Sequence, residues 1–98
     1  MILVVDVGTT GLRAALVRQD ATIAHVEYRS FAPDSPFPGM VEFDPAEMAR
    51  LVLDAAHASL AAAGNEPVTS VGIANQRAST IVWDRATGEP IGPGIGWQ

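Results

Sequence analysis

Residues 1–17 read MILVVDVGTTGLRAALV, and this stretch decides the fold. The apolar run before Asp6 and the run after Gly11 both have the composition of buried strands. Only a short turn with a glycine at each end separates them, so we expect an antiparallel hairpin with strands over residues 2–7 and 12–18. Asp6 would then stand at the end of the first strand, beside the turn.

The residues of this turn suit a phosphate group. A glycine at position 8 can adopt a positive φ and lets the backbone approach an anion closely. Successive backbone N–H groups in such a turn form an anion-binding concavity, and Thr9 and Thr10 add hydroxyl donors. Asp6 would repel a phosphate unless Mg²⁺ lay between them. An ordinary hairpin turn explains the same residues without a ligand, and neither the P-loop motif nor the dinucleotide-binding glycine motif occurs.

Composition narrows the function classes. The chain has 98 residues, which suits one small domain or a piece of a larger one, and its 48% hydrophobic content is that of a globular protein. Its net charge of −5 argues against non-specific binding to nucleic acid or to an anionic membrane. The absence of cysteine excludes disulfides, a thiolate nucleophile and a zinc finger. The apolar start is too short for a signal peptide or a membrane span, so we expect a cytoplasmic protein.

The middle of the chain predicts a third strand, a loop and a helix. The strand covers about residues 22–30, and the proline-rich residues 31–44 are expected to form an irregular loop. Asp44 is a good helix N-cap, Pro45 fits the first helical position, and Glu47 completes a capping box. Gly64 ends the helix. The stripe at helical spacing that we expect to be buried consists of Met48, Leu51, Val52, Ala55, Ser59 and Ala62.

Two further strands are predicted, over about residues 68–75 and 80–84, with a surface turn over residues 85–90. A strand reached through a helical crossover lies parallel to an earlier one, so the strand at 68–75 should pair with the first strand in one mixed α/β sheet. Ligands gather at the carboxyl ends of such strands. We therefore expect Asp6 and residues 75–77 to meet at one edge of the sheet.

Two later residues are candidates for contacts with a second ligand. Arg77 offers a fork of hydrogen-bond donors for hydroxyl or phosphate oxygens, and Trp97 could provide a flat apolar wall for a sugar or polyol. A surface salt bridge for Arg77 and a core-filling role for Trp97 are the alternatives, because a single arginine or tryptophan is weak evidence.

Several motifs occur together in a fixed order along essentially the whole chain. They are DVGTTGLRA from Asp6, PGMVEFDP from Pro38, GIANQR from Gly72, VWDRATGEPI from Val82 and GWQ from Gly96. This series resembles the N-terminal part of the FGGY carbohydrate kinases, particularly the glycerol kinases. Several motifs at compatible spacings identify a family far more specifically than any one of these motifs does alone.

The resemblance implies an α/β fold of the actin/hexokinase/Hsp70 ATPase superfold, with an RNase-H-like mixed sheet and a helix packed on it. Residues 1–98 would form a truncated N-terminal lobe of a kinase that phosphorylates a sugar or polyol with ATP. Asp6 matches the acid that holds Mg²⁺. The nucleotide phosphates would be bound by Gly8, Thr9, Thr10, Gly11 and Arg13. The substrate would be bound by Arg77 and Trp97.

One departure from the family pattern concerns the substrate. In glycerol kinases a glutamate follows the arginine and accepts a hydrogen bond from glycerol, whereas here the position is Ala78. A site built to bond a hydroxyl discriminates strongly through such a group, so we expect another polyol or a sugar.

The resemblance also implies that the catalytic base is an aspartate far beyond residue 98. We therefore expect no catalytic residue and no kinase activity in these residues alone. Apolar faces left without their cover would favour a homodimer or strand exchange. Two other functions stay open: a nucleotide-binding ATPase lobe of the same superfold without sugar kinase activity, and an interaction module with no ligand.

Overall fold

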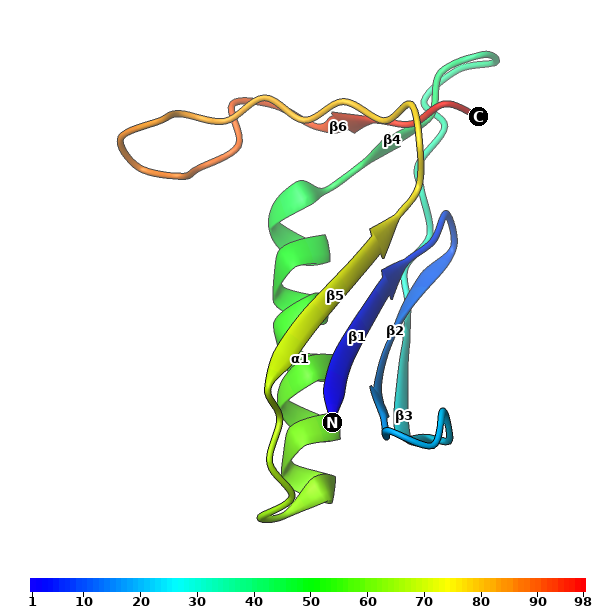
Figure 1. Cartoon of the computed structure of the whole chain (residues 1–98). Coiled ribbons are helices and arrows are strands. Elements are labelled where there is room, and N and C mark those ends of the chain that lie inside the picture. Colours follow the sequence, from blue (N-terminus) through cyan, green and yellow to red (C-terminus); the bar gives the residue numbers. More distant parts are fainter.

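The computed structural model describes residues 1–98 as two sheets and one helix (Figure 1). The main sheet has four strands in the order β3-β2-β1-β5, and α1 packs on one of its faces. A two-stranded sheet, β4-β6, lies at the end of the molecule where α1 begins. The elements are β1 (Ile2–Val7), β2 (Gly11–Val17), β3 (Ile23–Ser30), β4 (Glu42–Phe43), α1 (Pro45–Ala63), β5 (Ser70–Asn75) and β6 (Gly94–Ile95).

The predicted strand arrangement of the main sheet is confirmed. β1 and β2 form the expected antiparallel hairpin, in which Asp6 lies opposite Arg13. β5 lies parallel to β1, with Leu3 beside Val71 and Val7 beside Asn75. This parallel pairing brings the carboxyl ends of β1 and β5 to the same edge of the sheet, as the crossover predicted.

The core lies between α1 and the inner strands. Alternate residues of β1 and β2 point to the helix, because successive side chains of a strand face opposite sides. Ser59 is fully buried in the helix face and donates a hydrogen bond of 2.7 Å to the carbonyl oxygen of His25. The expected stripe is correct through Ser59 but wrong in its last turn, where Ala63 is buried and Ala62 is exposed. The buried core residues are Leu3, Val5, Val7, Leu12, Ala14, Leu16, Ala55, Ala56 and Ala63.

Both ends of α1 have the predicted caps. The Asp44 carboxylate accepts hydrogen bonds from the N–H groups of Ala46, at 2.9 Å, and Glu47, at 3.2 Å. Gly64 closes the helix with a φ of 64°, a conformation that glycine adopts without strain. The expected return bond of a capping box is not formed. The Glu47 carboxylate instead lies 3.9 Å from the Arg50 guanidinium, one helical turn later.

An ion pair joins the exposed side of α1 to β3. Arg29 Nε donates a hydrogen bond of 2.6 Å to Asp54 Oδ2, and Arg29 also contacts Glu27 at 3.2 Å. The hydrogen bond from Arg29 lowers the pKa of Asp54 below its ordinary value. The pair therefore ties the helix to an edge strand.

The predicted strand over residues 80–84 is wrong. This segment is extended, but it makes only isolated bridges, from Thr80 to Ile95 and from Trp83 to Pro90. It forms one side of a long arm that extends beyond the main sheet (Figure 1). The predicted surface turn at its tip is confirmed, because the Asp84 carboxylate accepts hydrogen bonds from the N–H groups of Ala86 and Thr87.

No helix of the structure combines the length and the apolar composition that a membrane crossing requires.

Candidate functional site

An open cavity of about 680 Å³ lies at the carboxyl ends of β1 and β5. The size is within the usual range for small-molecule sites. Its lining comes from three parts of the chain that are far apart in sequence. The lining residues are Asp6, Val7, Gly8 and Thr9, then Asn75, Gln76, Arg77 and Ala78, and finally Trp97. The expectation that Asp6 and Arg77 meet at one edge of the sheet is therefore confirmed.

The hairpin beside the cavity is closed by its own backbone. The Gly8 N–H donates to the carbonyl oxygen of Gly11 at 2.9 Å, and a Cβ at Gly8 would come within 3.1 Å of that oxygen. The expected positive φ at Gly8 is wrong, since the glycines with positive φ are Gly39, Gly64 and Gly88. Glycine is needed here for the close approach of two backbone segments. Its N–H is used within the turn, so an anion would have to be met by groups of the following residues.

The substrate-side candidates are open to solvent in this cavity. Arg77 forms no ion pair, unlike Arg18, Arg29 and Arg50, so the salt-bridge alternative is wrong. Trp97 is 60% exposed, so it does not fill the core formed by residues 1–98. A free guanidinium and an exposed indole are thus present where a polar ligand with an apolar face could reach both.

The turn that carries Arg77 is held in an unusual conformation. Ala78 has a φ of 55°, a region that residues with a side chain rarely adopt. Gln76 Oε1 and Ser79 Oγ are buried without a hydrogen-bond partner. Buried polar atoms are normally paired, and strained backbone is found at functional sites, so these features make the turn a candidate for part of a site; His25 on β3 has the same two features outside the cavity.

The other residues predicted to bind phosphate do not line the cavity. Thr10 is exposed at the tip of the hairpin, and Gly11 is buried beneath the Tyr28 ring. Arg13 lies on β2, where its guanidinium is 4.0 Å from the Asp6 carboxylate and over the Tyr28 ring. The structure therefore places Arg13 next to Asp6 on the face of the sheet that α1 does not cover.

The oxygen groups around Asp6 could bind Mg²⁺ only together with a phosphate ligand. No group of three or more acidic, histidine or cysteine side chains is close enough to hold a metal. Asp6 supplies one exposed carboxylate, and its neighbours Gly8 and Thr9 offer backbone or hydroxyl groups. Magnesium commonly binds through one or two carboxylates, with phosphate oxygens and waters completing its shell. Asp6 is thus suited to hold a metal–phosphate complex but not a bare ion.

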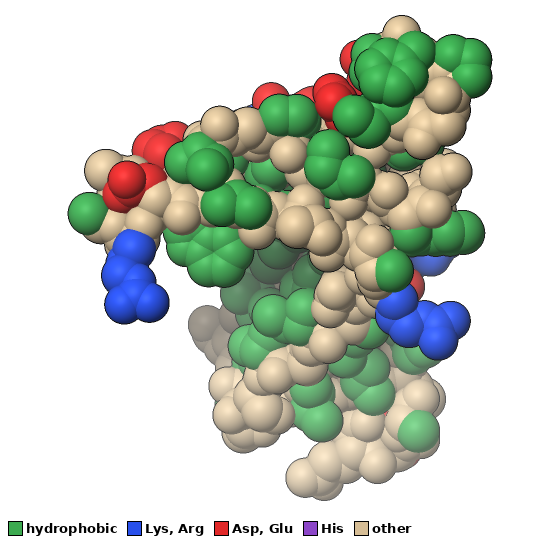
Figure 2. All heavy atoms as spheres, turned by 90° about the horizontal axis from the view of Figure 1, so that it is seen from above, with side chains coloured by type: hydrophobic (Ala, Val, Ile, Leu, Met, Phe, Trp, Pro, Cys, Tyr) green, Lys and Arg blue, Asp and Glu red, His purple; other side chains and the backbone are tan.

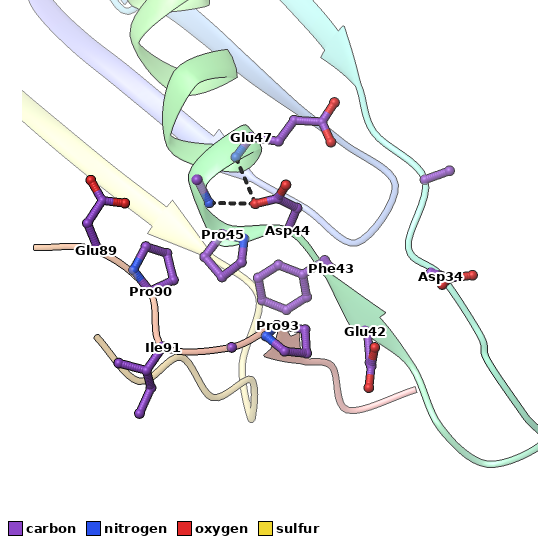
Figure 3. A pocket seen from close by; sticks show the side chains of 13 residues that line it. Asp34, Glu42, Phe43, Asp44, Pro45, Glu47, Glu89, Pro90, Ile91 and Pro93 are labelled. Atoms are coloured by element: carbon purple, nitrogen blue, oxygen red, sulfur yellow. Dashed lines mark hydrogen bonds between the residues drawn. The ribbon is translucent and has the colours of Figure 1, made fainter. Parts of the chain in front are cut away.

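A second hollow, of about 690 Å³, lies at the amino end of α1 (Figure 3). Carboxylates of Asp34, Glu42, Glu47 and Glu89 surround it, with Pro90 and Pro93 on the side of the arm. The side chain of Asp44 already binds the free N–H groups of the helix. With no basic residue in its lining, this hollow cannot hold a phosphate, and the cavity at Asp6 remains the candidate site.

Sequence reasoning missed Tyr28. The tyrosine lies opposite Arg13 in the β2–β3 register, and its ring contacts the hairpin at Gly11. Only the register of the third strand could have shown this, and the imperfect alternation of residues 22–30 left that register undetermined.

The family model that describes the N-terminal domain of the FGGY family of carbohydrate kinases matches residues 1–98. The chain is 43% identical over 100 residues to a glycerol kinase of Methylobacterium nodulans and 44% identical over 99 residues to one of Thermus brockianus. These two matches include 100% and 99% of the chain. The chain spans only 20% of the length of each relative.

Solved structures of similar proteins have the same fold. The chain superposes on a glycerol kinase of Plasmodium falciparum, determined with ADP, with a TM-score of 0.91 at 24% identity. It superposes on a xylulose kinase of Brucella ovis with a TM-score of 0.88 at 26% identity. The matches cover 99% and 97% of the chain and 20% of each of those proteins. The mixed sheet with its packed helix is therefore the fold found at this part of sugar kinases, as the motifs predicted.

Proposed function

Because the chain belongs to the FGGY family of carbohydrate kinases, we propose that it forms part of the N-terminal lobe of an enzyme that phosphorylates a sugar or polyol with ATP. The observation that carries the proposal is the single cavity that Asp6, Arg77 and Trp97 share. A phosphoryl donor and its acceptor must lie side by side for transfer, and this cavity offers one group of residues for each.

The donor side comprises Asp6, the hairpin and Arg13. Asp6 would hold Mg²⁺, which when bound neutralises charge on the phosphates. The hydroxyls of Thr9 and Thr10, together with the backbone at Gly11, would receive phosphate oxygens, and the missing side chain of Gly8 would let the phosphate approach the turn closely. Arg13 adds a positive charge beside Asp6.

The acceptor side comprises Arg77 and Trp97. The unpaired guanidinium of Arg77 would donate hydrogen bonds to substrate hydroxyls, while the indole of Trp97 packs against the carbon skeleton. Ala78 lines the same cavity and has no side-chain acceptor, which supports an acceptor substrate other than glycerol. The presence of Arg77 and Trp97 at the cavity favours this function over an ATPase lobe without sugar kinase activity.

The proposal assigns no catalytic base to residues 1–98. The acidic residue that accepts the proton of the attacking hydroxyl would come from a later part of a full-length kinase, so these residues alone would be inactive. We place the enzyme in the cytoplasm, where ATP is abundant.

Steady-state kinetics with a panel of sugars and polyols test the proposal in a full-length kinase that carries this chain. Arg77→Ala should lower kcat/KM for the acceptor by about 10- to 100-fold and leave KM for ATP unchanged, because it removes charged hydrogen bonds to one substrate only. Arg85→Ala is the matched control, since Arg85 lies in the turn at the far end of the arm and lines neither hollow. A change in KM for ATP alone, or no phosphorylation of any sugar or polyol, would contradict the proposal.

A further inference from the structure

Three side chains form a row across β1, β2 and β3 on the face of the sheet opposite α1. The register pairs Asp6 with Arg13 and Arg13 with Tyr28. Directly opposed residues in antiparallel strands point to the same face and their side chains are neighbours. A carboxylate, a guanidinium and a phenol ring therefore follow one another beside the hairpin.

The contact with Asp6 does not hold Arg13 firmly. The shortest distance from the guanidinium to the carboxylate is 4.0 Å, and the two side chains are 61% and 54% exposed. Exposed ion pairs at such a separation add little to stability, because water and salt screen the two charges and two flexible side chains must be ordered.

The Tyr28 ring offers a better-defined contact. The guanidinium carbon of Arg13 lies 5.5 Å from the ring centroid, within the range of a cation–π interaction. An aromatic ring also has few rotatable bonds, so a stacked guanidinium is confined to a defined place over the sheet.

Gly11 allows the ring to lie where it does. A Cβ at position 11 would collide with the Tyr28 hydroxyl and come within 2.6 Å of the ring carbon Cζ. With any other residue there, the ring would have to move away from the base of the hairpin. Gly11 thus permits the contact between a β3 side chain and the first turn of the chain.

We propose that Tyr28 is a positioning residue that holds the Arg13 guanidinium beside the hairpin for contact with the nucleotide phosphates. The inference rests on the phosphate-binding role proposed above for Arg13. It assigns to β3, which contributes nothing to the cavity lining, a part in binding the phosphoryl donor.

A double-mutant cycle in a full-length kinase that carries this chain tests the inference. The variants are Tyr28→Phe, Tyr28→Leu, Arg13→Ala and the combination of Tyr28→Leu with Arg13→Ala. Their Kd for Mg·ADP is measured by calorimetry, and KM is measured for ATP and for the acceptor. Tyr28→Leu should weaken Mg·ADP binding about two- to fivefold, the value of an exposed cation–π contact. Tyr28→Phe should bind as the unmodified protein does, and KM for the acceptor should not change.

The combination should bind Mg·ADP no more weakly than Arg13→Ala alone, because Tyr28 acts through Arg13. Additive effects would overturn the inference, as would a Tyr28→Leu variant with normal binding while Arg13→Ala is impaired. If Arg13→Ala itself binds normally, the proposed role of Arg13 is wrong and the inference fails with it.

A second measurement does not depend on activity or on a longer protein. In the 98-residue chain, ring currents from Tyr28 should shift the Arg13 side-chain proton resonances upfield, and Tyr28→Leu should abolish this shift while Tyr28→Phe keeps it. Arg13 protons at ordinary positions in the unmodified chain would show that the stacking is absent and would overturn the inference.

Discussion

Ala78 occupies a position where one side chain would change the hydrogen-bonding capacity of the cavity. It lines the cavity next to Arg77, and its methyl group can neither donate nor accept a hydrogen bond. In the glycerol kinase pattern that this chain resembles, a glutamate stands at this position. The identity of this residue therefore bears on which hydroxyl compound the site prefers.

Ala78→Glu should raise kcat/KM for glycerol at least tenfold relative to the preferred acceptor, because a hydroxyl-binding carboxylate is restored. Kinetics with glycerol and the substrate panel in the full-length enzyme would measure this. Ala78→Leu is the control that adds bulk without an acceptor, and it should not improve glycerol turnover. Glycerol as the best acceptor of the unmodified enzyme would contradict the expectation.

At the level of elements, the small sheet depends on one aromatic contact. Phe43 of β4 is buried, and its ring lies directly against Gly94 of β6. A Cβ at Gly94 would overlap the ring, with the Cε1 atom only 2.9 Å away. Phe43 is only 7% exposed, whereas Tyr28 at Gly11 is 50% exposed, although the Phe43 ring also borders the hollow at the amino end of α1.

Gly94→Ala should therefore destabilise the protein by about 1–3 kcal/mol, the usual cost of overpacking a filled site. Urea denaturation followed by tryptophan fluorescence would measure the loss. Gly92→Ala serves as the matched control, because a Cβ at that position meets nothing within 4 Å. Equal stability of the two variants would show that Phe43 is free to move.

Elements with local signals could be predicted from the sequence, and elements formed by distant contacts could not. The hairpin has its glycines and α1 has its caps within a few residues, and the crossover rule then placed β5 beside β1. β4 and β6 were missed, since two residues carry no periodicity and their pairing joins segments far apart in sequence. Residues 80–84 have a strand-like composition, but no neighbouring strand pairs with them continuously.

The same distinction applies to the candidate site. The meeting of Asp6 with Arg77 followed from topology, and Trp97 was placed by resemblance to a family. Tyr28 and the strained backbone of Ala78 depend on register and on turn geometry, which a single sequence does not specify.

At the level of the whole molecule, the chain is open for its size. Its radius of gyration is 15.1 Å, whereas a compact domain of this length has one of about 13 Å. On the face seen in Figure 2, hydrophobic side chains lie in several groups, and the basic side chains seen there lie near its margins. On β5, Val71 and Ile73 point to the helix side of the sheet but are 60% and 71% exposed, because α1 packs on the other strands.

The two edges of the main sheet differ in protection. β3 carries the charged residues Glu27 and Arg29 and an irregularity in its pairing near His25, features that hinder edge-to-edge association. β5 has no charged residue, no proline and no irregularity. Half of its backbone groups face away from β1, where another strand could pair with them.

We therefore expect the 98-residue chain to self-associate through β5, as a weak dimer or by strand exchange. Sedimentation velocity should show a mean mass that rises with concentration. Ile73→Lys should restore the monomer, whereas Ile23→Lys, at a position of β3 that is 67% exposed, should not. A monomer at all concentrations, or an equal effect of both substitutions, would contradict this expectation.

The parallel ladder between β1 and β5 has a consequence for how related chains can diversify. Adjacent strands stand about 4.8 Å apart whatever connects them, so the spacing between Asp6 and the turn at Arg77 is independent of the long connection that joins their strands. Insertions and deletions in the loop between β3 and β4 therefore leave that spacing unaltered. Related chains can vary this loop while Asp6 and the turn at Arg77 keep their separation.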